Sequence, residues 1–427
     1  QCGIIKSMMA MGVTSLDSIM YVVRALHAAV SLIPVWAGFA ITRMVTRSDR
    51  WAVAAGLVMA LHFALPFLGV RNLIEVVGGN IWILAIYYLY RWEAKRQVTS
   101  LYAAGILTGL AWMIRFQTAF AVLPVPFVLW WRDRSLKSAV HYSAGVMIML
   151  LVSGLADWLV LGRFASSTIR NLTMNAGLDA MYDTMPLMYL AVVLVLLIPP
   201  TSVVAVWLWM RRSFWSRHTL LMVSFLSFFV FHSLHVNQQE RFLFPILPHI
   251  LLMTVLAIYH KIEHDGHLFR NSAVTRIAAG WAISVNLLLL AFLTPAYGHK
   301  GLIEPIMALG HMEPKPRVLI VQPEIRRWTP DSYAGPGLSR HNIRDWKYLD
   351  SSYIDNLNLD YVLLYPVPRS AHQAYVDSVE KVLGPVRLAW HVEPSAYDWL
   401  LYHLNPRHNR SYEAWIYRPL SSSETGE

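Results

Sequence analysis

The most informative polar residues lie in the run 235–248, where a dense polar patch leads directly into an apolar segment. Arg241 presents a planar guanidinium with five N–H donors, a geometry that suits the oxygens of a phosphate. Glu240 beside it is suited to orienting the arginine or to accepting hydrogen bonds from sugar hydroxyls, and His235 opens the patch. A plain polar turn does not require the pattern Arg-Phe-x-x-Pro-x-x-Pro, so this run indicates a site for an anionic ligand.

Arg71 and Glu75 form a second candidate pair. If both belong to one helix, their spacing of four residues places them on the same face. Two interpretations follow, and the sequence leaves both open. The pair either makes a local ion pair at the start of a helix or contacts a donor or acceptor substrate at the membrane surface.

Arg115 is a third candidate, because it lies between two short apolar segments in the run Met-Ile-Arg-Phe-Gln. An arginine in this setting can extend toward the lipid headgroups and have no further role. The alternative is that Arg115 lines a polar cavity and binds an anion there.

The loop 162–186 holds the weakest candidates. Asp179 and Asp183 would share a helix face if this stretch is helical, and Arg163 and Arg170 precede them. Charges of both signs between two long apolar segments are typical of a solvated loop, so we expect these two carboxylates to have a lesser claim to a catalytic role.

The elements that position these residues are transmembrane helices. Ten apolar segments are long enough, or nearly so, to cross a hydrocarbon core of roughly 30 Å. They lie near residues 21–42, 51–69, 74–90, 100–114, 118–131, 138–161, 187–210, 219–235, 243–260 and 275–294. The fourth and fifth are short for a span, which predicts that they are tilted, broken or partly interfacial.

The composition agrees with a polytopic membrane protein. Hydrophobic residues make up 56% of the 427 residues and charged residues 15%, and the mean hydropathy is +0.41. These values exclude a soluble globular, disordered or coiled-coil chain. The single cysteine, Cys2, excludes a disulfide framework and a cysteine-based metal site. We expect no metal and no other cofactor.

The distribution of basic residues predicts the topology. The net charge of +10 does not indicate nucleic-acid binding, because the basic residues fall in short clusters between apolar segments rather than on one soluble face. The clusters follow the first, third, fifth, seventh and ninth segments, which is the positive-inside pattern. The loops containing 70–73, 115–117, 162–186 and 235–242, and the chain after about residue 296, are therefore assigned to the periplasmic or lumenal side.

The chain changes character at its C-terminal end. We assign residues 1–296 to a transmembrane domain and residues 297–427 to a small soluble α/β domain on the outer face. Short apolar runs at 318–321, 361–365, 386–390 and 415–417 predict strands, and the spacing of apolar residues in 371–383 predicts a helix.

Three of these stretches resemble glycosyltransferase family 22, the lipid-linked mannosyltransferases that include a glycosylphosphatidylinositol mannosyltransferase. Residues 240–248, Glu-Arg-Phe-Leu-Phe-Pro-Ile-Leu-Pro, are similar to the family's His-Lys-Glu-x-Arg-Phe-x-x-Pro-x-x-Pro signature. Residues 71–75 resemble its Arg…Asn…Glu element, and residues 109–116 its Gly-Leu-Ala…Arg-Phe element. The likeness covers most of residues 20–260.

This resemblance implies a GT-C-like fold and transfer of mannose from polyprenyl-phosphate or dolichyl-phosphate mannose, with inversion at the anomeric carbon. The acceptor it implies is a lipid-linked glycan or a glycolipid. Arg241 and Arg115 would contact the departing phosphate, and Glu240 and Glu75 would position sugar hydroxyls or the arginines. We expect the protein to be multi-pass, in a bacterial inner membrane in preference to the endoplasmic reticulum.

The sequence departs from the family pattern at two points. Asn237, Gln238 and Gln239 stand where the signature begins with His-Lys-Glu, which indicates a divergent branch. The family's acidic element, His-Pro-Asp-Glu, is not found, and Asp17 in the corresponding region does not match it. We therefore expect the catalytic base to lie upstream of Gln1. A membrane transporter and a non-catalytic membrane scaffold remain alternatives to the enzyme.

Overall fold

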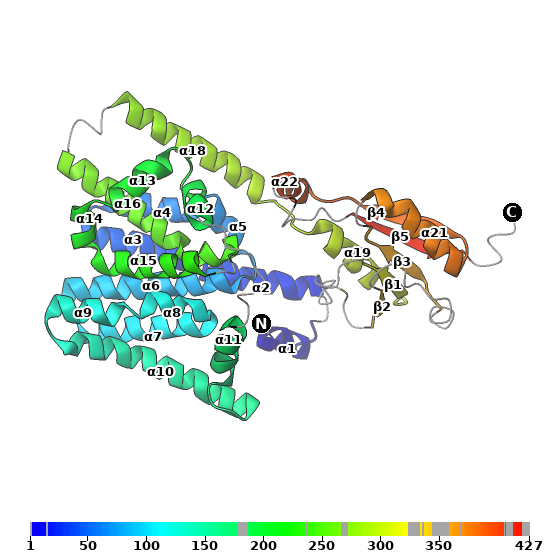
Figure 1. Cartoon of the computed structure of the whole chain (residues 1–427), viewed down its shortest axis with the longest axis horizontal. Helices are drawn as coiled ribbons and strands as arrows, with labels where there is room; N and C mark the ends of the chain where they lie inside the picture. The colour runs from blue at the N-terminus through cyan, green and yellow to red at the C-terminus, as the bar shows by residue number, and fades with distance from the viewer. Residues whose placement is uncertain are drawn as a thin grey trace. The chain divides into compact units, whose positions relative to one another are not determined.

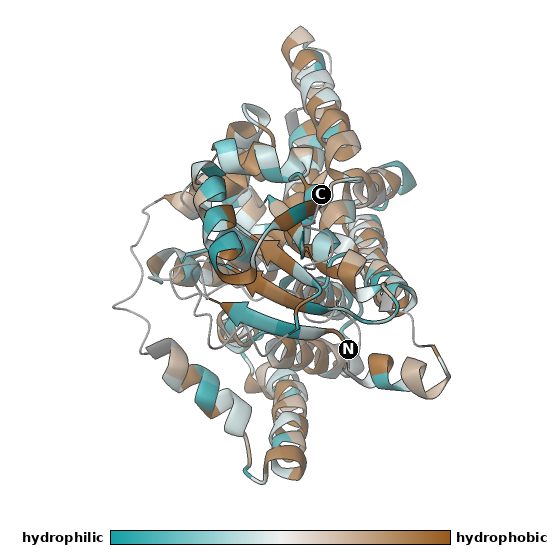
Figure 2. Ribbon diagram, turned by 90° about the vertical axis from the view of Figure 1, so that its right-hand side faces the viewer, coloured by the Kyte–Doolittle hydropathy of each residue, from teal (hydrophilic) through white to brown (hydrophobic). Residues whose placement is uncertain are grey.

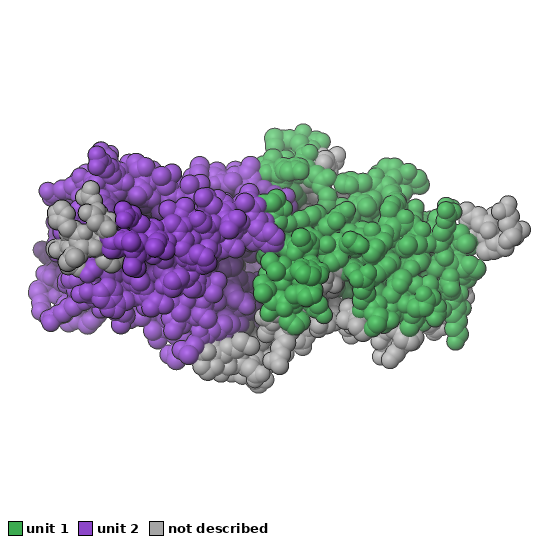
Figure 3. Space-filling model, turned by 90° about the horizontal axis from the view of Figure 1, so that it is seen from above, with its two compact units in different colours: residues 1–22, 295–427 green, residues 23–294 purple. Residues whose placement is uncertain are grey.

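The computed structural model describes residues 2–13, 16–176, 187–235, 238–265, 272–322, 334, 337–343, 358–366, 369–404, 406 and 413–420. Asp179 and Asp183 lie outside these ranges. The chain divides into two compact units, residues 23–294 and residues 1–22 together with 295–427 (Figure 3). The sequence-based boundary at 296/297 lies two residues from the division at 294/295.

The helical unit, residues 23–294 (purple in Figure 3), contains helices and no strand in its described residues (Figure 1). All ten apolar segments fold as helices, some of them as two consecutive helices. In chain order these are α2 (Leu16–Val30), α3 (Leu32–Thr46), α4 (Asp49–Leu61), α5 (Ala64–Gly69), α6 (Ile74–Lys95), α7 (Val98–Ile114), η1 (Phe116–Thr118), α8 (Ala119–Val122), α9 (Val125–Asp133), α10 (Leu136–Leu161), α11 (Ser166–Ala176), α12 (Met188–Leu196), α13 (Thr201–Trp209), α14 (Arg212–Arg217), α15 (Thr219–Leu234), η2 (Glu240–Ile246), α16 (Leu247–Asp265) and α18 (Ala273–Leu293).

Some of these helices are long and apolar enough to cross a membrane by themselves. Within the described ranges, four helical stretches are long and apolar enough to cross a membrane, namely Asp17–Thr46, Leu136–Leu161, Glu240–Glu263 and Ala273–Leu293. α7 and α15 are shorter apolar helices, and the expected fifth segment is divided between α8 and α9. Several apolar helices of uneven length therefore build this unit.

The segment 187–210 is not the single straight span that its hydropathy predicts. α12 and α13 meet at 110°. The break lies at Pro199 and Pro200, which lack the backbone N–H that a continuing helix needs. This segment is therefore a bent helix pair, and the two prolines are the physical reason for the bend.

Close helix packing depends on glycine at two places. A Cβ atom on Gly145 of α10 would lie 2.6 Å from the carbonyl oxygen of Tyr102 on α7. A Cβ atom on Gly79 of α6 would lie 2.6 Å from the Cα and carbonyl oxygen of Pro245 in η2. Only glycine permits these approaches, so η2 lies directly against α6.

The other unit, residues 1–22 and 295–427 (green in Figure 3), contains a five-stranded mixed sheet in the order β2-β1-β3-β5-β4. Its strands are β1 (Arg317–Val321), β2 (Ser339–Ile343), β3 (Tyr361–Leu364), β4 (Val386–Val392) and β5 (Ala414–Pro419). β1 pairs in parallel with both β2 and β3, and β5 pairs antiparallel with β3 and β4. The central strands are apolar (brown in Figure 2), and the polar strand β2 forms one edge.

A helix covers each face of this sheet. α19 (Lys300–Gly310) packs Leu302 and Ile306 on the face that includes Ile320. α21 (His372–Leu383) packs Tyr375 and Val379 on the opposite face. The four predicted strands and the predicted helix are present, whereas β2, α19 and the short helix α22 (Ala396–Leu404) were not anticipated.

Candidate functional site

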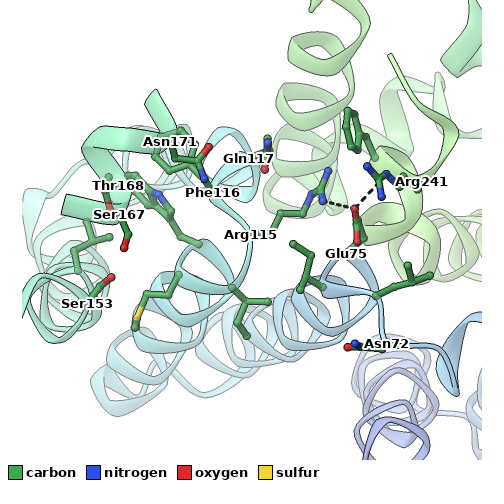
Figure 4. Close-up of a pocket in the computed structure, with 17 residues that line it drawn as sticks. Asn72, Glu75, Arg115, Phe116, Gln117, Ser153, Ser167, Thr168, Asn171 and Arg241 are labelled. Carbon is green, nitrogen blue, oxygen red and sulfur yellow. Dashed lines mark ion pairs between the residues drawn. The ribbon is translucent and has the colours of Figure 1, made fainter. Parts of the chain in front are cut away.

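A cavity of about 420 Å³ opens in the helical unit, between the beginning of α6, the end of α7, the helices α10 and α11, and η2 (Figure 4). Glu75, Arg115 and Arg241 lie together at one end of it. Arg115 follows Glu75 by 40 positions in the chain, and Arg241 follows Arg115 by 126 positions. The fold therefore collects three of the predicted site residues in one place.

Glu75 occupies the first turn of α6, where the unpaired backbone N–H groups and the helix dipole favour a carboxylate. Its side chain is 5% exposed. Oε1 of Glu75 lies 2.6 Å from Nη1 of Arg115 and 3.9 Å from Nε of Arg241. One buried carboxylate thus faces two guanidinium groups.

Arg115 ends α7 in an extended conformation, which turns the chain from α7 into η1. Its side chain is 3% exposed, so the arginine does not extend to the headgroups as the first interpretation required. Nη1 is used by Glu75, but the buried Nε and Nη2 have no acceptor among the residues that the structure describes. Because a buried donor without an acceptor is costly, these two groups are candidates for contact with the oxygen atoms of a ligand.

Arg241 lies in η2, and its side chain is 53% exposed. Its Nε donates a hydrogen bond of 2.8 Å to Oε1 of Gln239. The backbone N–H of Gln239 in turn donates to the hydroxyl of Tyr189 on α12 at 3.2 Å. Arg241 is therefore oriented by a neighbour that is itself fixed to another helix.

The ring of Phe242 contacts both arginines. The guanidinium carbon of Arg115 lies 4.8 Å from the ring centroid and that of Arg241 lies 5.5 Å from it. Both distances are within the range of a cation–π contact. With two guanidinium groups and one carboxylate, this end of the cavity carries a net charge of +1 when all three are ionised, and a phosphate would offset it.

Uncharged polar side chains gather around the other end of the cavity. Ser153 comes from α10, and Ser167, Thr168 and Asn171 come from α11 (Figure 4). Both the backbone N–H and the hydroxyl of Ser167 donate to the carboxylate of Asp157 at 2.7 Å, which ties the start of α11 to α10. Hydroxyl and amide groups of this kind suit the hydroxyls of a sugar.

The remaining predicted residues are placed differently. Arg71 precedes α6, so it does not share a helix face with Glu75, and of the two open interpretations the local ion pair is not observed, because Glu75 pairs with Arg115. Its guanidinium instead donates to the carbonyl oxygen of Phe67 at 2.6 Å. Glu240 is exposed and His235 half-buried, and neither is part of the cavity wall. Gln239, not Glu240, orients Arg241.

Sequence reasoning missed three contributors to the site. Gln239 was counted as a departure from a family pattern, although its amide oxygen holds Arg241. Tyr189 contacts residue 239 from 50 positions away, and no local signal identifies such a contact. Gly79 carries a usable signal, because the Gly-Gly pair inside an apolar helix indicates a close backbone approach. Within the described ranges, no group of three or more metal-binding side chains occurs.

Comparisons with known proteins agree with this architecture. Residues 4–158, just over a third of the chain, match the family model of dolichyl-phosphate-mannose-protein mannosyltransferase. No curated protein matches the chain. This family has a different description from glycosyltransferase family 22, so the assignment to family 22 is not confirmed.

Two solved structures are similar over nearly the whole chain. Both are ArnT from Cupriavidus metallidurans, one bound to undecaprenyl phosphate and one in the apo state. The TM-scores are 0.54 and 0.55, each with 14% sequence identity. The alignments cover 95% of this chain and 85% and 84% of the two ArnT chains. The chain is thus a mostly helical, multi-pass membrane protein with the GT-C fold of ArnT and a small C-terminal sheet domain.

Proposed function

We propose that this protein is a membrane glycosyltransferase that transfers mannose from a polyprenyl-phosphate mannose donor, with inversion at the anomeric carbon. The observation that carries the proposal is the buried guanidinium of Arg115, with Nε and Nη2 unmet, in a cavity with a surplus of positive charge. The family model over residues 4–158 supports mannose and a dolichyl-phosphate carrier as the donor. The ArnT fold, seen with undecaprenyl phosphate, supports a lipid phosphate as the bound group.

Arg115 and Arg241 would stabilise the leaving group. As the glycosidic bond to the phosphate breaks, negative charge accumulates on the phosphate oxygens. Two fixed guanidinium groups can supply charge-assisted hydrogen bonds to these oxygens in a site of lower dielectric than water. Arg241 is the more exposed of the two, so it would meet the phosphate first as the lipid enters from the membrane surface.

Glu75 would act as a positioning residue. It is the only carboxylate among the described residues that line the cavity. Its Oε1 already accepts from Nη1 of Arg115 at 2.6 Å and lies 3.9 Å from Nε of Arg241, so the carboxylate is engaged by the two arginines. In this proposal Glu75 keeps the guanidinium groups of Arg115 and Arg241 close together, so that both can contact the same phosphate. The residue that removes the acceptor's proton is left unassigned.

The residues of the site say less about the acceptor than about the donor. The resemblance of residues 240–248 to glycosyltransferase family 22 favours a lipid-linked glycan or glycolipid as the acceptor. The description of the matching family names a protein as the acceptor instead. We place the cavity and the C-terminal domain on the periplasmic side of a bacterial inner membrane, with the lumenal side of the endoplasmic reticulum as the alternative. Fractionating the labelled product into lipid and protein would separate the two acceptor classes.

The proposal is tested with variants of Arg241, in membranes that contain the protein together with lipid and protein acceptors, supplied with radiolabelled polyprenyl-phosphate mannose. Arg241→Ala should lose more activity than Arg241→Lys, because an ammonium supplies charge without the planar fork. Loss of one such donor costs about 3 kcal/mol in the transition state, or roughly a hundredfold in rate. Arg163→Ala is the control, because Arg163 is exposed and lies outside the cavity wall. Near-normal transfer by both Arg241 variants at unchanged protein levels would remove Arg241 from the site.

A further inference from the structure

The end of the cavity formed by α10 and α11 has a hydrogen-bond polarity of its own. Ser167 lies in the cavity wall, in the first turn of α11 (Figure 4). Its hydroxyl donates to Oδ1 of Asp157 on α10 at 2.7 Å, and its backbone N–H donates to Oδ2 at 2.7 Å. Both oxygen atoms of the Asp157 carboxylate are therefore engaged by this one residue.

This arrangement decides what Ser167 can offer to a ligand. A serine hydroxyl has one proton to donate and two lone pairs that accept. Because the carboxylate of Asp157 takes the proton in a charge-assisted hydrogen bond, Ser167 can only accept a hydrogen bond from a molecule in the cavity. A group that contacts Ser167 must supply a proton itself, as the hydroxyl of a sugar does and an ionised phosphate does not.

Two contacts fix α11 at the wall of the cavity. The first N–H groups of a helix have no partner within it, and Asp157 accepts from one of them, the N–H of Ser167. Before the helix begins, the ring of Phe164 packs against Gly154 of α10 so closely that a Cβ atom on residue 154 would overlap the ring. In this position α11 brings Ser167 and Asn171, four residues apart on one side of the helix, to the cavity wall.

The two ends of the cavity therefore suit opposite kinds of group. Arg115 and Arg241 at one end carry donors and positive charge. At the other end Ser167 is an acceptor, and the negative charge of Asp157 behind it repels an anion. The cavity volume of about 420 Å³ is in the usual range for sites that bind small molecules. A ligand with one anionic group and several hydroxyls thus has one favoured orientation.

From these observations we propose that Ser167 accepts a hydrogen bond from a hydroxyl of the sugar on the lipid phosphate, and that Asp157 is the positioning residue that keeps Ser167 an acceptor. The inference rests on the proposed function, because it takes a sugar linked to a lipid phosphate as the ligand. It adds the orientation of that ligand, with the phosphate at Arg115 and Arg241 and the sugar at α11. Asp157 acts through Ser167 and does not contact the sugar.

The experiment measures binding of undecaprenyl phosphate and of undecaprenyl-phosphate mannose to the full-length protein in nanodiscs. Ser167→Ala removes the hydroxyl, and Ser167→Thr keeps it. Asp157→Asn cannot accept both hydrogen bonds of Ser167, because its amide nitrogen is only a donor. Thr173→Ala is the matched control. Thr173 is exposed on the same helix, lies outside the cavity wall and uses its hydroxyl within α11.

We expect Ser167→Ala and Asp157→Asn to bind the mannose-bearing lipid about fivefold more weakly, the effect of losing one ordinary hydrogen bond. Their affinity for undecaprenyl phosphate should not change. Ser167→Thr and Thr173→Ala should bind both lipids as the parent does. Among monodeoxy analogues of the mannose-bearing lipid, one should bind the parent about fivefold more weakly but bind Ser167→Ala as well as the mannose lipid does, because the two changes remove the same contact.

Equal weakening of both lipids in Ser167→Ala and Asp157→Asn would refute the inference, because the two residues would then serve only the fold of α11. Parent-like binding of the mannose-bearing lipid by these variants would refute it as well. In both cases undecaprenyl phosphate still binds the parent, so the proposed phosphate site is not contradicted. Failure of the parent to bind either lipid would refute the proposed function, and the inference with it.

Discussion

The contact between Gly79 and Pro245 gives the sharpest test of how the site is positioned. In Gly79→Ala, the new Cβ would lie 2.6 Å from the Cα and carbonyl oxygen of Pro245, whereas ordinary contact begins at 3.4 Å. The backbone of η2 must therefore retreat by at least 0.8 Å, the difference between these two distances. Arg241 precedes Pro245 by four residues in η2 and would move with it.

The expected magnitude follows from that displacement. A shift of about 1 Å in a catalytic group can cost roughly a hundredfold in rate. Overpacking typically costs about 1–3 kcal/mol of stability, and replacing a helical glycine by alanine returns about 1 kcal/mol. We therefore expect Gly79→Ala to lose most transfer activity and to bind undecaprenyl phosphate at least tenfold more weakly, with a small decrease in Tm.

Gly78→Ala is a matched control in the same helix. Its Cβ would meet its nearest neighbour, the Cβ of Arg115, at 3.6 Å, which is an ordinary contact. This variant gains the same helix propensity without displacing η2, so its activity should stay within about twofold of the parent while its Tm rises slightly. Activity close to that of the parent in both variants would refute the positioning role of the Gly79–Pro245 contact. Equal loss in both would show that helix flexibility matters instead.

Three further predictions concern charge and topology. Glu75→Gln should lower Tm strongly, since an uncompensated buried charge costs about 3–5 kcal/mol, and undecaprenyl phosphate should raise the Tm of this variant more than that of the parent. Burial, followed by the nearby His391 and Arg369, lowers the pKa of His372 below 6.5. The unfolded chain therefore binds more protons, so stability should fall as the pH decreases below about 6.5, and His372→Gln should reduce this slope in thermal melts. In a Cys2→Ser background, single cysteines at Ser48 and Ser135 should resist impermeant thiol reagents in intact cells, and one at Ser339 should react; labelling at Ser135 would contradict the topology.

The sequence was sufficient to locate the helical segments and to single out three residues that lie together at the cavity. The apolar segments fold as helices because an unpaired backbone is too costly in a hydrocarbon core. Arg115, Arg241 and Glu75 stood out because charged residues at the edge of apolar segments need a reason to be there. Their partners were not predictable, since Glu75 pairs with a residue 40 positions away rather than with Arg71. That pairing depends on where α6 begins, and Arg71 lies outside the helix.

The elements that were missed lack a local pattern. β2 reads Ser-Arg-His-Asn-Ile, with no apolar alternation, because it lies at one edge of the sheet in the described part of the chain, paired with β1. The bend between α12 and α13 was visible as a Pro-Pro pair, but the apolar run on both sides favoured one span. Gln239 gave no local signal for its role, because its contact with Arg241 depends on the backbone conformation of a turn.

The arrangement of Glu75, Arg115 and Arg241 is better explained by a ligand than by a structural ion pair. A structural pair gains stability when each buried charge has a partner and every donor is used. Here one carboxylate serves two guanidinium groups, and two buried donors of Arg115 have no acceptor within the described part of the chain. A buried donor without an acceptor costs about 1–3 kcal/mol, so a structural role alone does not account for these two donors. An anionic ligand with several oxygen atoms would supply the missing acceptors and the missing negative charge at once. We therefore propose that a phosphate bound here would use these donors and offset the surplus positive charge.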